Sequence, residues 1–237
     1  MKTGRIHSIE SLGSLDGPGI RTVFFMQGCN MKCLYCHNRD SWDCRGGEVI
    51  STGEILSAVK SYRAYYGHTG GVTFSGGEPL LQSDFLLEVV TGLKDMGVHC
   101  AIDTSGSLYN GNTERLIDQT DLVILDIKHS DPHMYRTLCG SDGSASFRTL
   151  EYLKKSRTPY WIRQVIVPGY TDSFQQIDML KELIMGKKSP ERVELLPYHD
   201  GGKDKWISLG QQYPLEAIGS PPSDLMSVLR TRLTSPS

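Results

Sequence analysis

Short runs of β-branched and aromatic residues alternate with longer segments of helical periodicity from about residue 20 onward. Apolar runs that end in glycine or polar turns predict strands, and apolar residues repeated every three or four positions predict helices. Six strands are predicted, over residues 22–26, 72–74, 98–102, 122–125, 160–167 and 192–196. Helices are predicted over residues 51–66, 83–93, 113–119, 144–155, 175–185 and 223–233.

Strands separated by helices indicate parallel βαβ units with right-handed crossovers. The run 122–125 is apolar at every position, which suits a strand buried on both faces. Ser51 and Glu54 have the spacing of a capping box, which places a helix start there. The sequence therefore predicts an α/β fold, a partial (β/α)₆ barrel of the TIM type with mostly parallel strands.

No repeat, low-complexity segment or linker divides the chain, so residues 1–237 are predicted to form a single domain. Residues 1–21 form an N-terminal segment before the first predicted strand. Residues 197–222 show little periodicity, and a loop of that length is expected to act as a lid or to face a partner.

The charges are nearly balanced, with 25 basic and 27 acidic residues and a formal net charge of −2. No overall field would attract nucleic acid or an anionic membrane. No signal peptide or apolar segment of membrane-spanning length is recognised, which predicts a cytoplasmic protein, and a monomer is expected. Clustered cysteines in such a reducing compartment are more often metal ligands or catalytic thiols than disulfides.

Polar and glycine-rich segments follow the predicted strands at their carboxyl ends. In a parallel α/β barrel these ends lie on one face, which carries the active site. The segments are Gly28-Cys29, Ser75-Gly76-Gly77-Glu78-Pro79, Asp103-Thr104-Ser105-Gly106, Asp126-Ile127-Lys128, Pro168-Gly169-Tyr170 and Pro197-Tyr198-His199. We expect the chemistry of the protein to gather on this face.

Three cysteines, Cys29, Cys33 and Cys36, supply soft ligands from one short loop, which favours an iron–sulfur cluster, zinc or copper(I). A four-iron cluster held by three thiolates keeps one iron open for an exogenous ligand. Two alternatives use the same residues. Cys33-Leu34-Tyr35-Cys36-His37 has the spacing of a c-type haem attachment site, and Cys44 could complete a four-cysteine zinc site.

The cysteine loop after the first predicted strand resembles that of the radical S-adenosylmethionine superfamily. Ser75-Gly76-Gly77-Glu78-Pro79, about forty residues later, resembles the glycine-rich turn of that superfamily. Further segments, from Gly4-Arg5-Ile6-His7-Ser8 to Lys205-Trp206, are similar to the activating enzymes of glycyl-radical proteins, and the resemblance covers roughly residues 4–222. The ferredoxin-like insertion of many sister activating enzymes is missing, since only Cys44 lies between the two motifs.

The resemblance implies a reaction, its cofactors and its partners. The cofactors are one 4Fe-4S cluster with an open iron, S-adenosylmethionine and a monovalent cation. Reductive cleavage of S-adenosylmethionine gives methionine and a 5′-deoxyadenosyl radical, which removes a hydrogen atom from a glycine of pyruvate formate-lyase or a related glycyl-radical protein. A flavodoxin or ferredoxin is the implied reductant, and neither nucleic acid nor membrane is an implied partner.

Site residues are carried over from the family motifs. The resemblance assigns the cluster to Cys29, Cys33 and Cys36, and the adenine side to Tyr35, Cys36 and His37. It assigns the methionine amino group to Gly77 and Glu78, the ribose and carboxylate to Asp126, Ile127 and Lys128, and the ribose and adenine to His199. The cation is assigned to Asp103, Thr104 and Asp126 with a carbonyl near Ile124, where the family has methionine. Asp16, Gly17, Pro18 and Gly19 are assigned to the substrate peptide.

Each polar residue also has an ordinary structural interpretation. Lys128 is a typical exposed lysine at a strand end, the two aspartates could cap helices or turns, and His199 could lie on a surface loop. Cys44, Cys100 and Cys139 are interpreted as free thiols. Two other functions remain open: a radical enzyme acting on a small molecule, such as 7-carboxy-7-deazaguanine synthase, and a non-catalytic metal-binding regulator.

Overall fold

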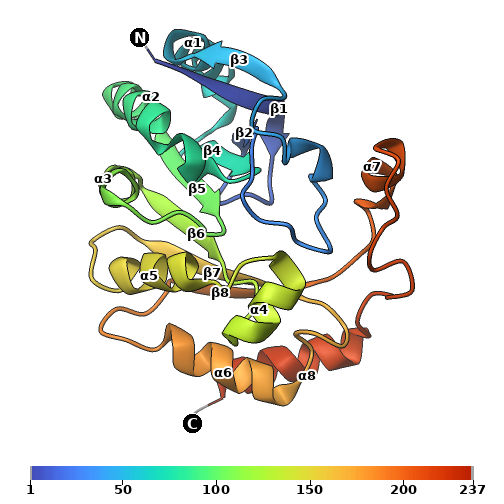
Figure 1. Ribbon diagram of the computed structural model, residues 1–237. Coiled ribbons are helices and arrows are strands. Elements are labelled where there is room, and N and C mark those ends of the chain that lie inside the picture. The colour runs from blue at the N-terminus through green and yellow to red at the C-terminus, as the bar shows by residue number, and fades with distance from the viewer. Residues whose placement is uncertain (1, 236–237) are drawn as a thin grey trace.

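The computed structural model describes residues 2–235, and a single mixed sheet forms its centre (Figure 1). Eight strands pair in the order β3-β1-β2-β4-β5-β6-β7-β8. Six of them run parallel, as the sequence predicted: β2 (Arg21–Met26), β4 (Gly71–Gly76), β5 (His99–Thr104), β6 (Leu122–Asp126), β7 (Tyr160–Ile166) and β8 (Arg192–Pro197). No pairing joins β8 to β3 among the described residues, so the sheet is an open, partial barrel and the predicted α/β class is confirmed.

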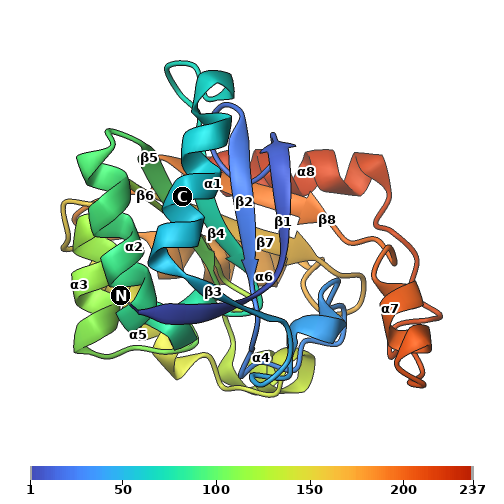
Figure 2. The same ribbon diagram turned by 90° about the horizontal axis from the view of Figure 1, so that it is seen from above.

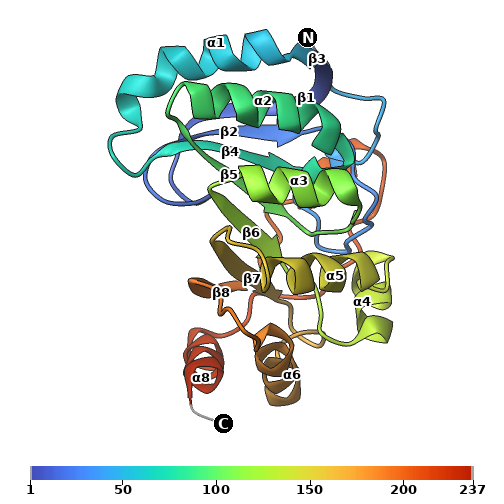
Figure 3. The same cartoon turned by 90° about the vertical axis from the view of Figure 1, so that its left-hand side faces the viewer.

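Helices follow the outside of the curved sheet (Figures 1 and 3). Their apolar faces pack on the sheet, and the largest buried cluster lies beneath the first two. They are α1 (Thr52–Tyr62), α2 (Ser83–Asp95), α3 (Gly111–Gln119), α5 (Ser144–Leu153), α6 (Phe174–Ile184) and α8 (Ser223–Thr234). The capping box predicted for α1 is present, because Ser51 and Glu54 exchange side-chain to backbone hydrogen bonds.

Two strands were not predicted. β1 (Thr3–Gly13) pairs antiparallel with β2, and β3 (Glu48–Ser51) pairs antiparallel with β1. Together they extend the sheet beyond β2. The register of β1 against β2 shifts at two places, between Ile6 and Ser8 and between Glu10 and Gly13. Such irregularities destroy the alternation of buried and exposed positions that identifies a strand in sequence. β3 has only four residues, which are too few to show the alternation of apolar and polar positions that identifies a strand.

The structure differs from the sequence-based predictions at three other places. α4 (Pro132–Cys139) follows β6 and was not predicted, although Asp131 caps its start and Gly140 ends it with a left-handed backbone (φ 71°). The segment 197–222 contains a short helix, α7 (Lys203–Ser208). The first helix ends at Tyr62, because a 3₁₀ turn follows and Tyr66 turns inward to bond the Thr22 hydroxyl at 2.8 Å.

The view from above shows α7 apart from the outer helices, on the far side of the sheet from α2 and α3 (Figure 2). There it contacts the segment after β2, because α7 packs on the 3₁₀ turn Arg39–Ser41. Within residues 2–235, no helix combines the length and apolar character required to cross a bilayer.

Candidate active site

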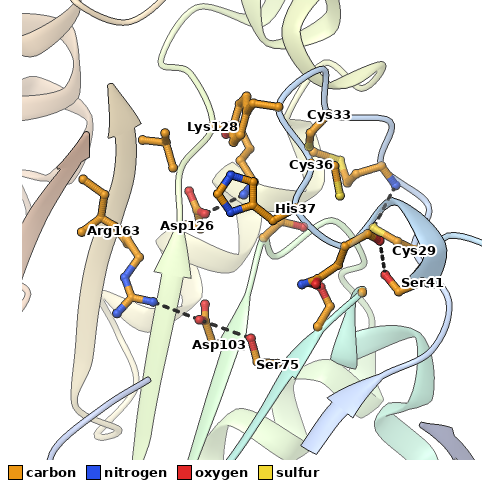
Figure 4. Close-up of a pocket in the computed structure, with 18 of the residues that line it drawn as sticks. Cys29, Cys33, Cys36, His37, Ser41, Ser75, Asp103, Asp126, Lys128 and Arg163 are labelled. Atoms are coloured by element: carbon orange, nitrogen blue, oxygen red, sulfur yellow. Dashed lines mark hydrogen bonds and ion pairs between the residues drawn. The ribbon is translucent and has the colours of Figure 1, made fainter. Parts of the chain in front are cut away.

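A cavity of about 320 Å³ opens at the carboxyl ends of the parallel strands (Figure 4). It brings together most of the residues singled out in the sequence, although they come from the ends of five different strands and the loops that follow them. Those that line it are Cys29, Cys33, Tyr35, Cys36, His37, Gly77, Asp103, Thr104, Asp126, Lys128 and His199. Glu78, Ile127 and the turn 16–19 are not among the lining residues.

The cysteine loop has no regular secondary structure and is held by its neighbours. Its backbone N–H groups at Lys32 and Leu34 donate to the last carbonyls of α4, at Cys139 and Leu138, both at 2.9 Å. The Trp206 indole of α7 donates to the Cys36 carbonyl at 3.0 Å. Outside contacts therefore fix a loop that cannot satisfy its own backbone groups.

Cys29, Cys33 and Cys36 all lie on the wall of the cavity (Figure 4). Burial raises the pKa of Cys29 and of Cys36, while the pKa of Cys33 is raised first by a hydrogen bond with Cys139 and then by burial. The metal-free thiols are therefore protonated at neutral pH, and metal binding there must release protons.

The four-cysteine zinc site considered from the sequence is not assembled. Cys44 is exposed and does not line the cavity. Within residues 2–235, no group of three His, Cys, Asp or Glu side chains converges at the spacing of a single metal ion. The structure places three thiols, rather than four, around the cavity.

The glycine turn after β4 packs directly against the start of the cysteine loop. The N–H of Glu78 donates to the Gly28 carbonyl at 2.8 Å, and a Cβ at position 77 would lie 2.2 Å from that same oxygen. Only glycine fits at position 77, because any side chain would separate the two segments. The turn thus leaves main-chain groups, without a side chain, facing the cavity.

Glu78 is fully buried and does not line the cavity. It accepts hydrogen bonds from the Leu80 N–H at 3.0 Å and from the Ser105 N–H at 3.1 Å. The hydroxyls of Thr104, Ser105 and Ser107 also donate to it. This side chain therefore ties the turn after β4 to the turn after β5, and a contact of Glu78 with the methionine amino group stays a prediction.

Lys128 lies inside the cavity and forms an ion pair with Asp126 at 2.5 Å. Burial alone would lower the pKa of Lys128, but Asp126 and other acidic neighbours raise it well above its usual value, so the ammonium is charged. The other Asp126 oxygen, Oδ1, and the Tyr35 hydroxyl are buried without a hydrogen-bond partner among the described residues. Such groups fit a polar, zwitterionic ligand that would complete their hydrogen bonding.

His37 and His199 meet at one end of the cavity. Their ring centroids lie 4.3 Å apart, and His37 Nε2 donates to the His199 carbonyl at 3.0 Å. Burial lowers the pKa of His37, which keeps its imidazole neutral and available for packing against a flat ring. The cysteine loop and the segment after β8 therefore lie together at this end of the cavity.

Arg163 of β7 connects the cavity with the turn that contains Asp16. Its guanidinium donates to Asp103 Oδ2, to Glu194 Oε2 and to the Leu15 carbonyl, each at 3.0 Å. Burial raises the pKa of Asp103 to about 6, although Arg163 opposes the shift. The turn 16–19 thus lies one side chain away from the cavity without lining it.

Several cavity residues were not identified as site residues from the sequence. Ser75 lies in the glycine-rich segment quoted for the resemblance and Arg163 lies in a predicted strand, but a serine beside glycines and a strand arginine carry no chemical signal of their own. Trp42 gave no signal, because its contact with Cys36 forms only when the loop folds back on itself. The other lining residues in this group are Met31, Asn38, Ser41, Gly76, Ser105, Val165, Leu196, Pro197 and Tyr198.

The cavity and its three thiols can be compared with known proteins. The profile of the Radical SAM superfamily matches residues 23–181. The chain is 46% identical over 219 residues to a pyruvate formate-lyase-activating enzyme of Clostridium pasteurianum, and 92% of each chain is covered. It is 40% identical over 226 residues to the pyruvate formate-lyase 1-activating enzyme of Escherichia coli strain K12, with 94% of this chain and 92% of that one covered.

Solved structures share the fold at lower identity. A domain of a pyruvate-formate lyase-activating enzyme from Bacteroides vulgatus superposes with a TM-score of 0.59 at 24% identity, over 70% of this chain and 93% of that one. The peptide-bound SuiB of Streptococcus suis gives a TM-score of 0.69 at 14% identity, over 90% of this chain and 45% of that one. At these identities the likeness concerns the fold alone.

Proposed function

The chain belongs to the radical SAM superfamily and, within it, to the family of the pyruvate formate-lyase-activating enzymes, and from this premise we propose its reaction and the role of each site residue. It acts on pyruvate formate-lyase, from which it removes a hydrogen atom at one glycine Cα to leave a glycyl radical. The single observation that carries this proposal is the convergence of three thiols, a glycine turn and a buried Lys128–Asp126 pair on one cavity.

The family implies a 4Fe-4S cluster and S-adenosylmethionine, and the donor set fits both. We assign the cluster to Cys29, Cys33 and Cys36, because three thiolates from one loop leave one iron for the substrate. When bound, the reduced cluster supplies the electron that cleaves S-adenosylmethionine into methionine and a 5′-deoxyadenosyl radical. The protein's own contribution is to orient the groups and to keep water away from them.

The remaining cavity residues bind S-adenosylmethionine. The main chain at Gly77, beside Glu78, accommodates the methionine amino group, since no side chain intrudes there. Lys128 is charged and directed into the cavity, so it neutralises the methionine carboxylate, while Asp126 Oδ1 accepts from the ribose. Ile127 is buried, its N–H donates to the Arg163 carbonyl and its carbonyl accepts from Gln164, so it contributes to the site by holding its two neighbours in position.

The adenine lies between the cysteine loop and the last strand in this proposal. His37 and His199 provide two adjacent ring faces, and Tyr35 provides a hydroxyl without a protein partner. A planar base is held by stacking and by backbone hydrogen bonds, which suits neutral rings. On the side of the cysteine loop, α7 packs on the 3₁₀ turn Arg39–Ser41 and its Trp206 donates to the Cys36 carbonyl.

A monovalent cation is proposed at Asp103, Thr104 and Asp126, near the Ile124 carbonyl. All three polar residues line the cavity and lie at neighbouring strand ends. One Asp103 oxygen already accepts from Arg163, so a cation there must share the carboxylate or replace that contact.

We propose that residues 1–237 act as one domain and as a monomer, reduced by a flavodoxin or ferredoxin in the cytoplasm. The turn Asp16-Gly17-Pro18-Gly19 would contact the glycine-bearing peptide of the partner. Its link to the cavity through Arg163 supports this, because a peptide seated on the turn would lie close to the reacting groups. The segment 197–222 is proposed as a lid that α7 anchors.

Removal of one cluster ligand tests the proposal. Anaerobically reconstituted protein should carry about four irons per chain and form 5′-deoxyadenosine from S-adenosylmethionine under reduction. We expect Cys33→Ala to lose both properties, whereas Cys44→Ala, which removes an exposed thiol of the same segment, should keep both. Iron analysis and chromatography of the nucleoside provide the measurements. Undiminished 5′-deoxyadenosine formation by Cys33→Ala would disprove the cluster assignment.

A further inference from the structure

The Trp42 side chain contacts one of the three thiols directly. Its indole Nε1 donates a hydrogen bond to Cys36 Sγ at 3.3 Å, and both residues line the cavity. Within residues 2–235, this is the one side-chain N–H that reaches a sulfur of the cysteine loop. The contact joins residues six positions apart and depends on the 3₁₀ turn Arg39–Ser41, which directs the chain back toward the loop.

Neighbouring groups hold the indole in this orientation. The Arg39 guanidinium lies 4.0 Å from the ring centroid and the Lys32 ammonium lies 4.4 Å from it. The Trp206 ring packs edge-on at 5.4 Å and donates its own N–H to the Cys36 carbonyl at 3.0 Å. Two tryptophans therefore bind Cys36, one at its sulfur and the other at its backbone oxygen.

The two contacts differ in what they do electrically. A thiolate ligand gains negative charge when an iron–sulfur cluster takes up an electron, so an N–H donor to that sulfur stabilises the reduced state more than the oxidised one. Cations close to the indole withdraw electron density from the ring and strengthen its N–H as a donor. A donor to the Cys36 carbonyl lies farther from the charge that changes and has little such effect.

We propose that Trp42 is a positioning residue that raises the reduction potential of the cluster through its hydrogen bond to Cys36. The inference rests on the proposed function, because it requires Cys36 to be a cluster ligand. Arg39 and Lys32 assist by fixing and polarising the indole. Reduction of the cluster is the entry to the reaction, so Trp42 makes that step accessible to a weaker one-electron donor.

Replacement of Trp42 by a ring without the N–H tests this role. In the reconstituted enzyme we expect Trp42→Phe to lower the equilibrium constant for cluster reduction about tenfold, which is a shift of about 59 mV to more negative potential for a one-electron couple. Trp206→Phe is the matched control, because it removes a tryptophan N–H from the same cysteine but not from its sulfur. Potentiometric titration followed by electron paramagnetic resonance of the reduced cluster gives both potentials.

A second variant separates the N–H from packing. Incorporation of 3-benzothienylalanine at position 42 keeps the shape of the bicyclic ring and replaces the N–H by sulfur, so it should show the same negative shift with full iron content. An unchanged potential in this variant, or an equal shift in Trp206→Phe, would overturn the proposal. Wild-type protein that binds no cluster would instead contradict the assignment of Cys36 as a ligand, and iron analysis detects that case.

Discussion

Asp103 is a carboxylate held in a position where burial opposes its charge. Burial raises its pKa from 3.8 to about 6, although Arg163 donates to it at 3.0 Å. The folded protein therefore binds this proton more tightly than the unfolded chain does. Stability from this group is complete below pH 3.8 and is lost as the pH rises through about 6.

We expect Asp103 alone to lower the free energy of unfolding by about 3 kcal/mol as the pH rises from well below 3.8 to well above 6, with about 2 kcal/mol of this fall between pH 4.5 and 7. Asp103→Asn cannot ionise, so its stability relative to wild type should increase over the same interval. Urea titrations from pH 4.5 to 7, in a buffer without sodium or potassium, provide the measurement. Asp95→Asn, at an exposed helix position, is the control. Parallel stability curves for wild type and Asp103→Asn would contradict the assignment.

The turn between β1 and β2 depends on a glycine that no other residue can replace. Gly19 has φ 68°, and a Cβ there would lie 2.5 Å from the Gly70 backbone nitrogen. The Pro18 carbonyl of this turn accepts from the Arg21 guanidinium at 2.9 Å, and the Asp16 carbonyl accepts from the Thr73 hydroxyl at 2.6 Å. Its shape is thus fixed from inside the barrel.

Gly19→Ala should lower the free energy of unfolding by roughly 2 kcal/mol or more, through backbone strain and through displacement of the turn. Gly210→Ala is the matched control, because Gly210 has φ 69° but open space around its Cβ position, and strain alone should cost about 1 kcal/mol. Denaturant titration measures both. If the turn contacts the partner, Gly19→Ala should also slow the activation of the partner. It should slow the formation of 5′-deoxyadenosine in the absence of partner to a smaller extent. Equal effects of the two variants on stability would refute the packing argument.

The parallel elements could be predicted from sequence because each strand is a dense apolar run between capped, periodic helices. β1 could not be predicted, because its bulges against β2 interrupt the alternation of buried and exposed positions that identifies a strand. α4 has a clear start at Asp131 and a clear end at Gly140, but its eight residues are too few to show a helical period. α7 is shorter still, and its fold depends on packing of Trp206 on the cysteine loop.

The same distinction holds for the candidate site. Residues at strand ends could be predicted to converge, because parallel strands bring their carboxyl ends to one edge. The direction of a side chain could not be predicted. Glu78 looks like a ligand-facing carboxylate in sequence, yet it accepts hydrogen bonds from Thr104 and Ser105 inside the fold. Trp42 and Arg163 make their contacts only after the chain has folded, so no local sequence pattern predicts that they line the cavity.

At the scale of the whole molecule, an open sheet with one covered face suits a protein substrate. The helices cover the outer face, while the cavity lies at the edge where the cysteine loop and the turn after β4 meet the ends of the other parallel strands (Figures 1 and 4). A peptide from a partner can approach such a cavity where a closed barrel would exclude it. Curated relatives of similar length, over which 92% of this chain aligns, are named for activity on pyruvate formate-lyase.

The transfer of one hydrogen atom from partner to nucleoside is the central claim. Pyruvate formate-lyase produced with Cα-deuterated glycine should be incubated with this protein, S-adenosylmethionine and a low-potential reductant without oxygen. The account predicts that 5′-deoxyadenosine gains deuterium by mass spectrometry, in step with a glycyl radical signal in the lyase. 5′-Deoxyadenosine that carries no deuterium, or a lyase that gains no radical, would contradict the account.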